Sequence, residues 1–313
     1  MSHAMAELST IASSSATDWT LERLHVLKGD ATVAVVIPAR NEQASVGTVV
    51  SAISNELGEF VDELVVMDSL STDTTASVAE AAGARVYSVA DVRPDLGAKP
   101  GKGEALWKSL FVTSSDVVVF IDADLTEWGT HFVTGVVGPL LADPAVMLSR
   151  GYYDRIFAAG GEVTLEGGRV TELVARPWLT LFRPALASMV QPLAGEWAIR
   201  RTAFERMHVP MGYGVELSTL LDVHDHWGPQ AIAQVDLGQR AHRHQNIHDL
   251  SAMATEILST AERRRERAAG LDIAPGIGEY VELAHLGRDR EWSVRPVVVG
   301  ERPPMISQTP LSS

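Results

Sequence analysis

The sequence predicts an α/β protein with a mostly parallel sheet flanked by helices. Two observations carry this prediction: apolar strand-like stretches alternate with helical stretches, and several of the strands run directly into polar loops. The clearest strand is 117–121, five apolar residues followed by Asp122 and Asp124. An apolar run of this length suits a strand that is buried on both faces, as in a parallel α/β sheet.

In the first half of the chain, strands and helices alternate regularly. Pro38 ends the first strand because proline has no N–H for the sheet ladder, and Gly83 suits a helix C-terminus because it adopts left-handed conformations. Alternation of this kind is typical of parallel strands with right-handed crossovers, which form a nucleotide-binding unit. Strands are predicted at 33–38, 63–68, from 85 and at 117–121, and helices at about 43–57, between Thr72 and Gly83, and at 103–112.

The second half is less regular. It predicts strands at 195–200 and 231–238, and helices at 171–178, 216–227 and about 250–268. The last helix carries a basic run, Arg263, Arg264, Arg265 and Arg267. Because Glu262 and Glu266 are interspersed at helical spacing, we interpret the run as a solvated helix face.

We expect one domain at 19–270, because no linker rich in Gly, Ser or Pro divides the chain. Residues 31–125 would form a nucleotide-binding half and residues 126–270 an acceptor-binding half. Residues 1–18 are dominated by small residues and are expected to be flexible. Residues 271–313 form a C-terminal extension that begins in a Pro- and Gly-rich stretch.

Composition excludes several classes of protein. The 313 residues carry a formal charge of −14, whereas nucleic-acid binding needs a positive footprint. Cysteine is absent, so there are no disulfides, thiolate metal sites or cysteine nucleophiles. Because the chain shows no signal peptide and no apolar run long enough to cross a bilayer, we expect a cytoplasmic protein without stable membrane insertion.

Asp122 and Asp124 mark the candidate site, because open α/β sheets bind ligands at the carboxyl ends of their strands. Two carboxylates one residue apart suit a hard divalent cation that also touches phosphate oxygens. A strand that ends in a helix cap explains the same residues without a ligand. His242 follows a predicted strand and could complete a metal site with Asp124, although a lone histidine is usually structural.

Polar loops at 38–42 and 68–73 leave the first two strands at the same sheet edge. A base and ribose would lie there in a doubly wound fold, although turn chemistry alone explains each loop. Lys102 lies between Gly101 and Gly103 at a helix start, which can hold a phosphate or be a plain Gly-rich helix entry. Three such features at equivalent positions favour nucleotide binding.

Two segments of the second half suit an acceptor and a sugar. Gly168 and Arg169 precede a helix start, where backbone N–H groups, the helix dipole and a guanidinium together favour an anion. Glu216, at another helix start, could hold sugar hydroxyls or stabilise positive charge at an anomeric carbon. A structural cap at Gly168 and a dipole-favoured Glu216 are the alternatives.

Taken together, these motifs resemble those of nucleotide-sugar glycosyltransferases of the GT-A fold, and more narrowly those of the glucosyl-3-phosphoglycerate synthases of actinobacteria. The similarity runs from about residue 33 to residue 244. It is carried by the segments 100–107, 168–177, 191–193, 195–196, 212–216 and 241–243.

The resemblance implies a homodimer that transfers glucose, with retention, from a nucleotide sugar to the 2-hydroxyl of 3-phosphoglycerate. It implies Asp124 and His242 as ligands of Mg²⁺ or Mn²⁺, and Glu216 with the Leu193 carbonyl at the reacting centre. The implied nucleotide-sugar residues are Pro38, Ala39, Glu42, Ser69, Lys102 and Asp122. The implied acceptor residues are Gly168, Arg169, Val170, Thr171, Arg240 and His244.

The chain departs from the family pattern at two positions. His244 replaces an Asn beside the expected acceptor site, and Leu70 replaces a Gly in the loop after the second strand. We expect UDP-glucose as donor, because backbone groups and a hydroxyl of the two loops can satisfy uracil. Glu42 and Asp68 keep guanine open, since either could accept two adjacent N–H groups.

Four alternatives remain open. The chain could be a mannosyl-3-phosphoglycerate synthase that uses a GDP-sugar, which shares this architecture. It could be an inverting transferase acting on polyprenyl phosphate, although it shows neither a membrane anchor nor an amphipathic element. A nucleotide-sugar-binding protein without turnover and a nucleotidyltransferase that releases pyrophosphate are the other two.

Overall fold

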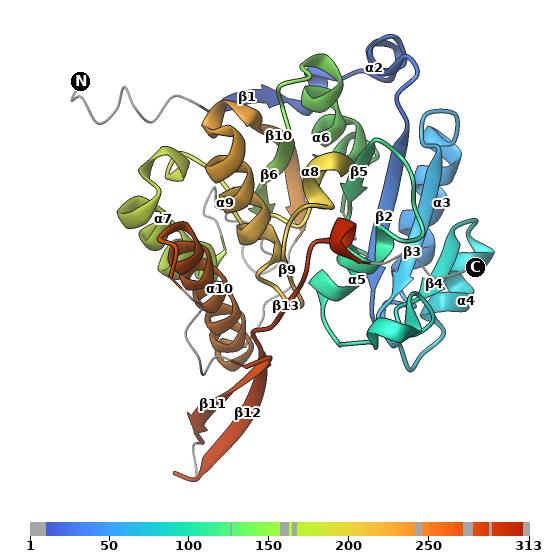
Figure 1. The fold of residues 1–313 in the computed structure, drawn as a ribbon. Helices are drawn as coiled ribbons and strands as arrows, with labels where there is room; N and C mark the ends of the chain where they lie inside the picture. Colours follow the sequence, from blue (N-terminus) through green and yellow to red (C-terminus); the bar gives the residue numbers. More distant parts are fainter. Residues whose placement is uncertain are drawn as a thin grey trace.

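The computed structural model describes residues 11–125, 127–156, 163–164, 168–241, 246–271, 278–287 and 290–308. At its centre a nine-stranded sheet has helices on both sides (Figure 1). Its strands lie in the order β1-β10-β6-β8-β5-β2-β3-β4, and β7 pairs with β6. Their bounds are β1 Ala12–Ser15, β2 Val33–Ala39, β3 Glu63–Asp68, β4 Arg85–Ser88, β5 Val117–Phe120, β6 Leu148–Ile156, β7 Val163–Thr164, β8 Trp197–Arg200 and β10 Ile232–Ala241.

Within this sheet, β7 and β8 are the antiparallel strands. β8 runs against both of its neighbours, β5 and β6, and β7 runs against β6. The other pairs are parallel. The strands β2, β3, β5, β6 and β10 therefore point the same way, and their carboxyl ends meet at one edge. The predicted mostly parallel sheet flanked by helices is confirmed.

Both faces of the sheet are covered by helices. Val35 of β2 packs in a core with α3 and α6, whereas its neighbour Val36 packs in a second core with α5 and α9. This explains why the strands are continuous apolar runs. The helices are α2 Leu21–Lys28, α3 Val46–Leu57, α4 Thr75–Ala81, α5 Lys102–Ser109, α6 His131–Ala142, α7 Arg176–Phe182, α8 Arg201–Phe204, α9 Val215–Trp227 and α10 Ile247–Ala268, with a π-helical turn at Thr171–Ala175.

The N-terminal segment differs from its prediction. We expected residues 1–18 to be flexible, but Ala12–Ser15 forms strand β1, which pairs in parallel with β10. The side chain of Ser15 then caps a short 3₁₀ helix by accepting a hydrogen bond from the N–H of Thr17. Pairing with a distant strand supplies the order that the small residues lack by themselves. Residues 1–10 lie outside the described part of the chain.

The basic run of α10 is also not a solvated face. Arg264 is 2% exposed and forms ion pairs with Asp222 of α9, at 3.0 Å, and with Glu301. Arg267 pairs with Glu301 as well, at 3.0 Å. The prediction failed because these partners are far away in the sequence. Arg265, which is half-exposed and paired with Glu262, fits the original interpretation.

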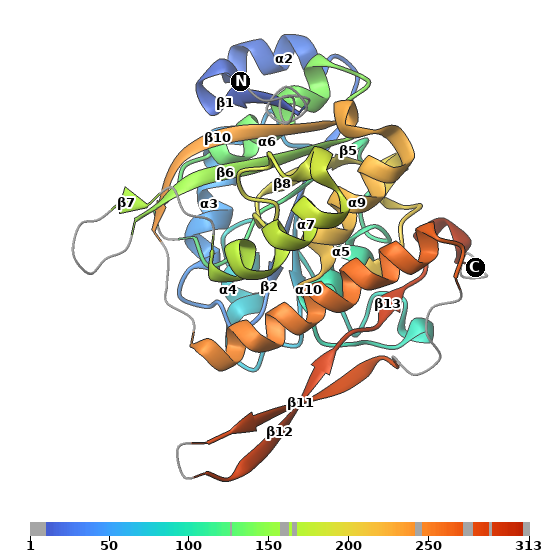
Figure 2. The ribbon, with the colours of Figure 1, turned by 90° about the vertical axis from the view of Figure 1, so that its left-hand side faces the viewer.

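The C-terminal extension leaves the body and returns to it. Strands β11 (Tyr280–Leu286) and β12 (Trp292–Val298) form an antiparallel ribbon that projects below α10 in Figure 2. Strand β13 (Glu301–Arg302) then pairs with β9 (Val209–Pro210). Arg302 binds the buried Glu104 of α5 through two 2.6 Å hydrogen bonds. No helix of the described residues is both long and apolar enough to cross a membrane.

Candidate active site

Lys102, the first residue of α5, lies between two carboxylates from other elements. Its Nζ is 2.6 Å from Oδ1 of Asp122, which follows β5, and 2.8 Å from Oε1 of Glu216, in the first turn of α9. The exposed fractions of the three side chains are 14%, 24% and 5%, in the order Lys102, Asp122, Glu216. The structure thus brings together three of the predicted site residues.

Lys102 is positively charged in this setting. Burial alone would lower the pKa of its ammonium group, but the carboxylates of Asp122 and Glu216 outweigh burial and raise that pKa above its ordinary value. A buried cation held between two anions is a preorganised electrostatic element, since its side chain is fixed before a ligand arrives.

The start of α5 is fixed by the loop that leads into α9. The N–H of Gly103 donates to the Gly212 carbonyl at 3.2 Å, and the N–H of Glu104 donates to the Met211 carbonyl at 3.0 Å. A Cβ at position 103 would lie 1.7 Å from the Pro210 carbonyl oxygen, so this approach requires glycine. Because these two N–H groups already donate to carbonyls, they are not available to a ligand. The group that this helix start can present to a ligand is the side chain of Lys102.

Gly195 lies directly against Asp122. A Cβ at position 195 would lie 2.2 Å from Oδ2 of Asp122. The segment that precedes β8 therefore covers one side of this carboxylate, while Lys102 holds its other oxygen. Leu193, two residues earlier, is partly buried and packs against the core shared by α5 and α9. This segment brings the predicted Leu193 to the side of the cluster.

Asp124 is exposed at the end of β5. With Asp122 it supplies the oxygen donors that Mg²⁺ and Mn²⁺ accept. The described residues contain no group of three or more His, Cys, Asp or Glu side chains that could hold a metal ion. The predicted ligand His242 lies outside the described residues, as does His244. β10 ends at the same sheet edge as β5, so residue 242 follows a strand of the correct polarity.

The two polar loops after β2 and β3 lie side by side. The N–H of Ser69 donates to the Ala39 carbonyl at 2.8 Å, and the N–H of Glu42 donates to the Thr75 hydroxyl at 2.8 Å. Oδ1 of Asp68 and Oγ of Ser69 are buried and have no hydrogen-bond partner within the described structure. Such groups are costly unless something completes them, so they favour a polar ligand at this edge.

Leu70 has a backbone conformation that favours glycine. Its φ is +61°, and Asn41 in the facing loop has a φ of +57°. Asparagine tolerates the left-handed region, whereas leucine is strained there. A glycine would adopt this conformation without strain, whereas Leu70 is strained and is 38% exposed.

The predicted acceptor segment opens the π-helical turn before α7. Arg169 is exposed, whereas Val170 and Thr171 are 7% and 3% exposed. The Gly168 carbonyl accepts a hydrogen bond from the N–H of Glu172 at 3.0 Å. Val170 and Thr171 can therefore offer a ligand mainly their backbone. Arg240 is part of β10, but its side chain lies outside the described set.

Glu256 of α10 was missed by the sequence analysis. Its Oε2 accepts a hydrogen bond of 2.6 Å from the N–H of Tyr213, which lies in the loop that leads into α9. Burial, and to a smaller extent the Glu216 carboxylate, raise the pKa of Glu256 to about 7, against the lowering effects of the Tyr213 N–H and of Arg295. Nothing in the local sequence marks Glu256, because its partner is 43 residues away.

This fold and site define a class of protein. A mostly parallel α/β sheet with a lysine and two carboxylates at its carboxyl edge, beside polar loops suited to a nucleotide, is the arrangement of a nucleotide-sugar transferase of the GT-A type. The model of glycosyl transferase family 2 matches residues 34–204.

The chain is 42% identical over 292 residues to glucosyl-3-phosphoglycerate synthase of Mycobacterium tuberculosis, which covers 92% of this chain and 89% of that protein. It is 38% identical over 285 residues to the synthase of Petrotoga mobilis, which covers 90% and 88%. A crystal structure of the M. tuberculosis enzyme in complex with Mn²⁺, uridine-diphosphate-glucose and phosphoglyceric acid matches with a TM-score of 0.82 at 40% identity, over 95% of this chain and 98% of that one. The chain belongs to glycosyl transferase family 2, and within it to the family of the glucosyl-3-phosphoglycerate synthases.

Proposed function

We propose that this chain transfers glucose from UDP-glucose to the 2-hydroxyl of 3-phosphoglycerate, with retention at the anomeric carbon, and releases UDP. The observation that carries the proposal is the cluster of Lys102, Asp122 and Glu216 at the carboxyl edge of the sheet. It occurs in a chain 40% identical to one crystallised with Mn²⁺, UDP-glucose and phosphoglyceric acid.

Pro38, Ala39, Glu42 and Ser69 would hold the nucleotide, with Lys102 and Asp122 next to the diphosphate and sugar. Support comes from the buried, unpartnered Oγ of Ser69 and Oδ1 of Asp68. Uracil presents one N–H between two carbonyls, so one acceptor, one hydroxyl and backbone groups satisfy it. Guanine presents two adjacent N–H donors and would leave groups unpaired in a site built for uracil.

Asp124 and His242 would hold Mg²⁺ or Mn²⁺ at this edge. When bound, the ion supplies Lewis-acid chemistry and neutralises the departing diphosphate. The donor set supports this assignment, since exposed carboxylate oxygens at a strand end can bind a hard cation together with phosphate oxygens.

Gly168, Arg169, Val170, Thr171, Arg240 and His244 would bind 3-phosphoglycerate. Arg169 is exposed at the start of a helical segment, where a forked guanidinium and the local dipole both favour an anion. The burial of Val170 and Thr171 supports contacts through their backbone N–H groups.

Glu216 would stabilise the transition state and not attack the sugar. Its Oε1 is already paired with Lys102 at 2.8 Å, and its side chain is 5% exposed. In the proposed front-face reaction, the C1–oxygen bond to the diphosphate breaks and a bond to the acceptor 2-oxygen forms on the same face. The diphosphate takes the acceptor proton, so the protein supplies positioning and electrostatics. The Leu193 carbonyl and Glu216 would stabilise the oxocarbenium-like charge.

We further propose that the enzyme is a cytoplasmic homodimer. The outward face of the β11–β12 ribbon supports the dimer, because Leu286, Trp292 and Val294 on it are 50%, 70% and 57% exposed. The opposite face already packs on α10 through Val297. Light scattering tests this: Trp292→Glu should give monomers, whereas Val26→Glu on α2, also at an exposed apolar position, should not. A monomeric native chain would contradict the dimer.

The decisive experiment is a matrix of UDP-glucose, GDP-glucose and GDP-mannose with and without 3-phosphoglycerate, reading released nucleoside diphosphate and product anomeric configuration. UDP-glucose should give the highest kcat/KM, the release should depend on acceptor, and the product should be the α-anomer. Equal or better turnover of a GDP-sugar would point to the mannosyl-type relative. Donor binding without turnover in any pair would indicate a binding protein.

A further inference from the structure

Arg150 is a charged residue near the start of strand β6, and it is completely buried. Its Nη1 donates to the Pro192 carbonyl at 2.6 Å, and its Nη2 donates to Oγ1 of Thr219 at 3.0 Å. The guanidinium carbon lies 5.5 Å from the centre of the Trp197 ring, on the neighbouring strand β8. Its Nε has no hydrogen-bond partner within the described structure.

This cation has no carboxylate within ion-pair distance among the described residues. Burial lowers the pKa of Arg150 to about 10, and the more distant Glu216 carboxylate counteracts part of that effect. The guanidinium is therefore still charged at neutral pH. A buried charge that lacks a paired anion is destabilising, so packing alone gives no reason for an arginine here.

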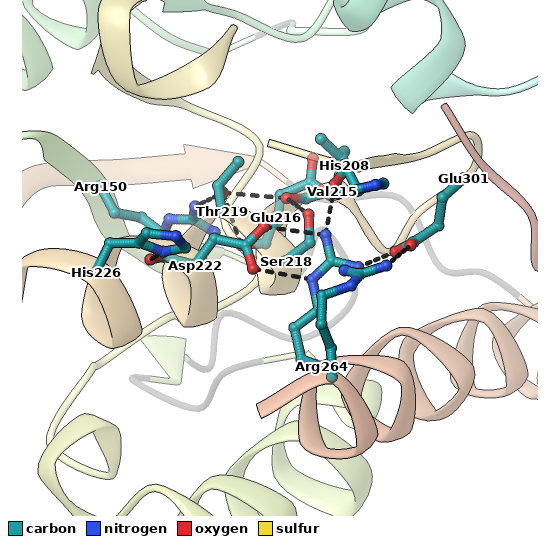
Figure 3. A network of polar contacts seen from close by, with 11 residues as sticks. Arg150, His208, Val215, Glu216, Ser218, Thr219, Asp222, His226, Arg264 and Glu301 are labelled. Carbon is teal, nitrogen blue, oxygen red and sulfur yellow. Dashed lines mark hydrogen bonds and ion pairs between the residues drawn. The ribbon is translucent and has the colours of Figure 1, made fainter. Parts of the chain in front are cut away.

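The two groups that Arg150 binds belong to two sides of the active site. Pro192 directly precedes Leu193, whose carbonyl is assigned to the reacting centre. Thr219 lies one turn after Glu216 on α9, and its hydroxyl is 3.0 Å from the carbonyls of both Val215 and Glu216 (Figure 3). One planar guanidinium thereby connects the Leu193 segment to the first turn of α9.

Arg150 supplies a second positive charge that acts on Glu216. Lys102 and Arg150 are cationic, and Asp122 and Glu216 are anionic. Lys102 holds both carboxylates directly, whereas Arg150 acts on Glu216 from inside the protein. Without Arg150, the cluster would carry excess negative charge where an anionic donor must bind.

We propose that Arg150 is a positioning residue for glucosyl transfer, which sets the Leu193 carbonyl and Glu216 relative to each other and offsets the charge of the Glu216 carboxylate. This inference rests on the proposed function. Because front-face transfer depends on geometry, a shift of either group should lower kcat and leave ground-state binding of donor and acceptor nearly unchanged.

The sharpest test removes the hydrogen bond between Arg150 and Thr219 and keeps the arginine. Thr219→Val conserves side-chain shape but cannot accept from Arg150, and Thr219→Ser restores the hydroxyl. Ser218→Ala is the matched control, since Ser218 is equally buried and bonds the Val215 carbonyl at 3.0 Å without contacting Arg150. Arg150→Lys keeps the positive charge but loses the planar guanidinium group, which bonds the Pro192 carbonyl and the Thr219 hydroxyl at the same time.

With UDP-glucose and 3-phosphoglycerate, Thr219→Val and Arg150→Lys should lower kcat about tenfold or more, with both KM values within about twofold of the native chain. Thr219→Ser and Ser218→Ala should retain near-native kcat. The proposal is overturned if Thr219→Val retains native kcat, if Ser218→Ala loses as much, or if the loss appears in KM. An inactive native chain would instead refute the proposed function itself.

Discussion

Oε1 of Glu216 lies 2.8 Å from Nζ of Lys102, where the first turns of α9 and α5 meet. The same ammonium group is 2.6 Å from Oδ1 of Asp122. One cation thus fixes carboxylates from two other elements, so the three side chains should respond to mutation as a unit.

Lys102→Met should raise the KM for UDP-glucose about ten- to a hundredfold, since a lost charge-assisted contact typically costs about 1.5–3 kcal/mol. It also leaves Asp122 and Glu216 without their shared cation. Initial-rate kinetics with varied donor measures the change. Lys99→Met is the control, because Lys99 pairs with Glu279 at 2.6 Å and not with the cluster. An unchanged donor KM in Lys102→Met would contradict the assignment.

Gly195→Ala should impair the enzyme although it adds a single methyl group. The new Cβ would lie 2.2 Å from Oδ2 of Asp122, so the carboxylate must move away from its Lys102 partner. We expect a higher donor KM and a lower kcat with little change in melting temperature. Gly278→Ala is a useful control, since the φ of Gly278 is not positive and a Cβ there would make only an ordinary contact, 3.9 Å from the Tyr280 carbonyl oxygen. Native kinetics in Gly195→Ala would show that this contact is not required.

Asp124→Ala should abolish turnover and leave the fold nearly intact, because an exposed carboxylate contributes little to packing. Calorimetric titration with Mn²⁺ in the presence of UDP should show lost metal binding. Glu127→Ala, which removes another exposed carboxylate three residues later, should keep both activity and metal binding. Near-native rates for Asp124→Ala at saturating Mn²⁺ would refute the metal assignment.

Arg169→Ala should raise the KM for 3-phosphoglycerate about ten- to a hundredfold and change the donor KM little, because it removes a charge-assisted contact to an anion. Arg206→Ala tests whether any exposed arginine matters, since the Arg206 Nε bonds the Thr202 carbonyl away from this segment. If the donor KM rises and the acceptor KM stays constant, we have exchanged the two binding regions.

Glu256 should make the folded state less stable as pH rises. Its pKa is about 7 in the folded protein and 4.5 as the ordinary value, so between these pH values the folded state binds a proton that the unfolded state releases. The contribution to unfolding free energy therefore falls with rising pH through this window, by up to about 3 kcal/mol.

Glu256→Gln removes this titration and keeps an oxygen that accepts the Tyr213 N–H. Denaturant unfolding from pH 4.5 to 7.5 should show the native-minus-variant stability declining with pH. Glu262→Gln should not reproduce that decline, because a hydrogen bond from Arg265 lowers the pKa of Glu262. A flat difference for Glu256→Gln would disprove the shift.

The fold was predictable where a residue pattern reflects its own environment. The strands at 33–38 and 63–68 were visible because they are buried on both faces. Helix α6 was not, because it is apolar on all sides and contains Gly135, Gly138 and Pro139, so it has no amphipathic period. Its Gly138 is explained only by distant Trp19, whose ring atom Cδ2 would lie 2.1 Å from a Cβ there.

For the site, single residues could be predicted from the sequence, but the contacts between them could not. The sequence identified Lys102, Asp122 and Glu216 separately, because each lies at a strand end or a helix start. Their mutual ion pairs depend on α5 and α9 meeting, which no local pattern encodes. Arg150 carries no local signal, because it lies between Ser149 and Gly151, and its partners Pro192 and Thr219 are 42 and 69 residues away.

The antiparallel strand β8 has a consequence for how the chain assembles. It lies between β5 and β6 in the sheet, yet it comes long after β5 in the chain. A nascent chain can pair β2, β3, β4 and β5 early, but the free edge of β5 must wait until residue 200 has left the ribosome. β1 waits longer, because its partner β10 ends at Ala241. Such late, long-range pairing slows folding and leaves an apolar edge exposed. The strand nearest the N-terminus is thus made first and docks among the last.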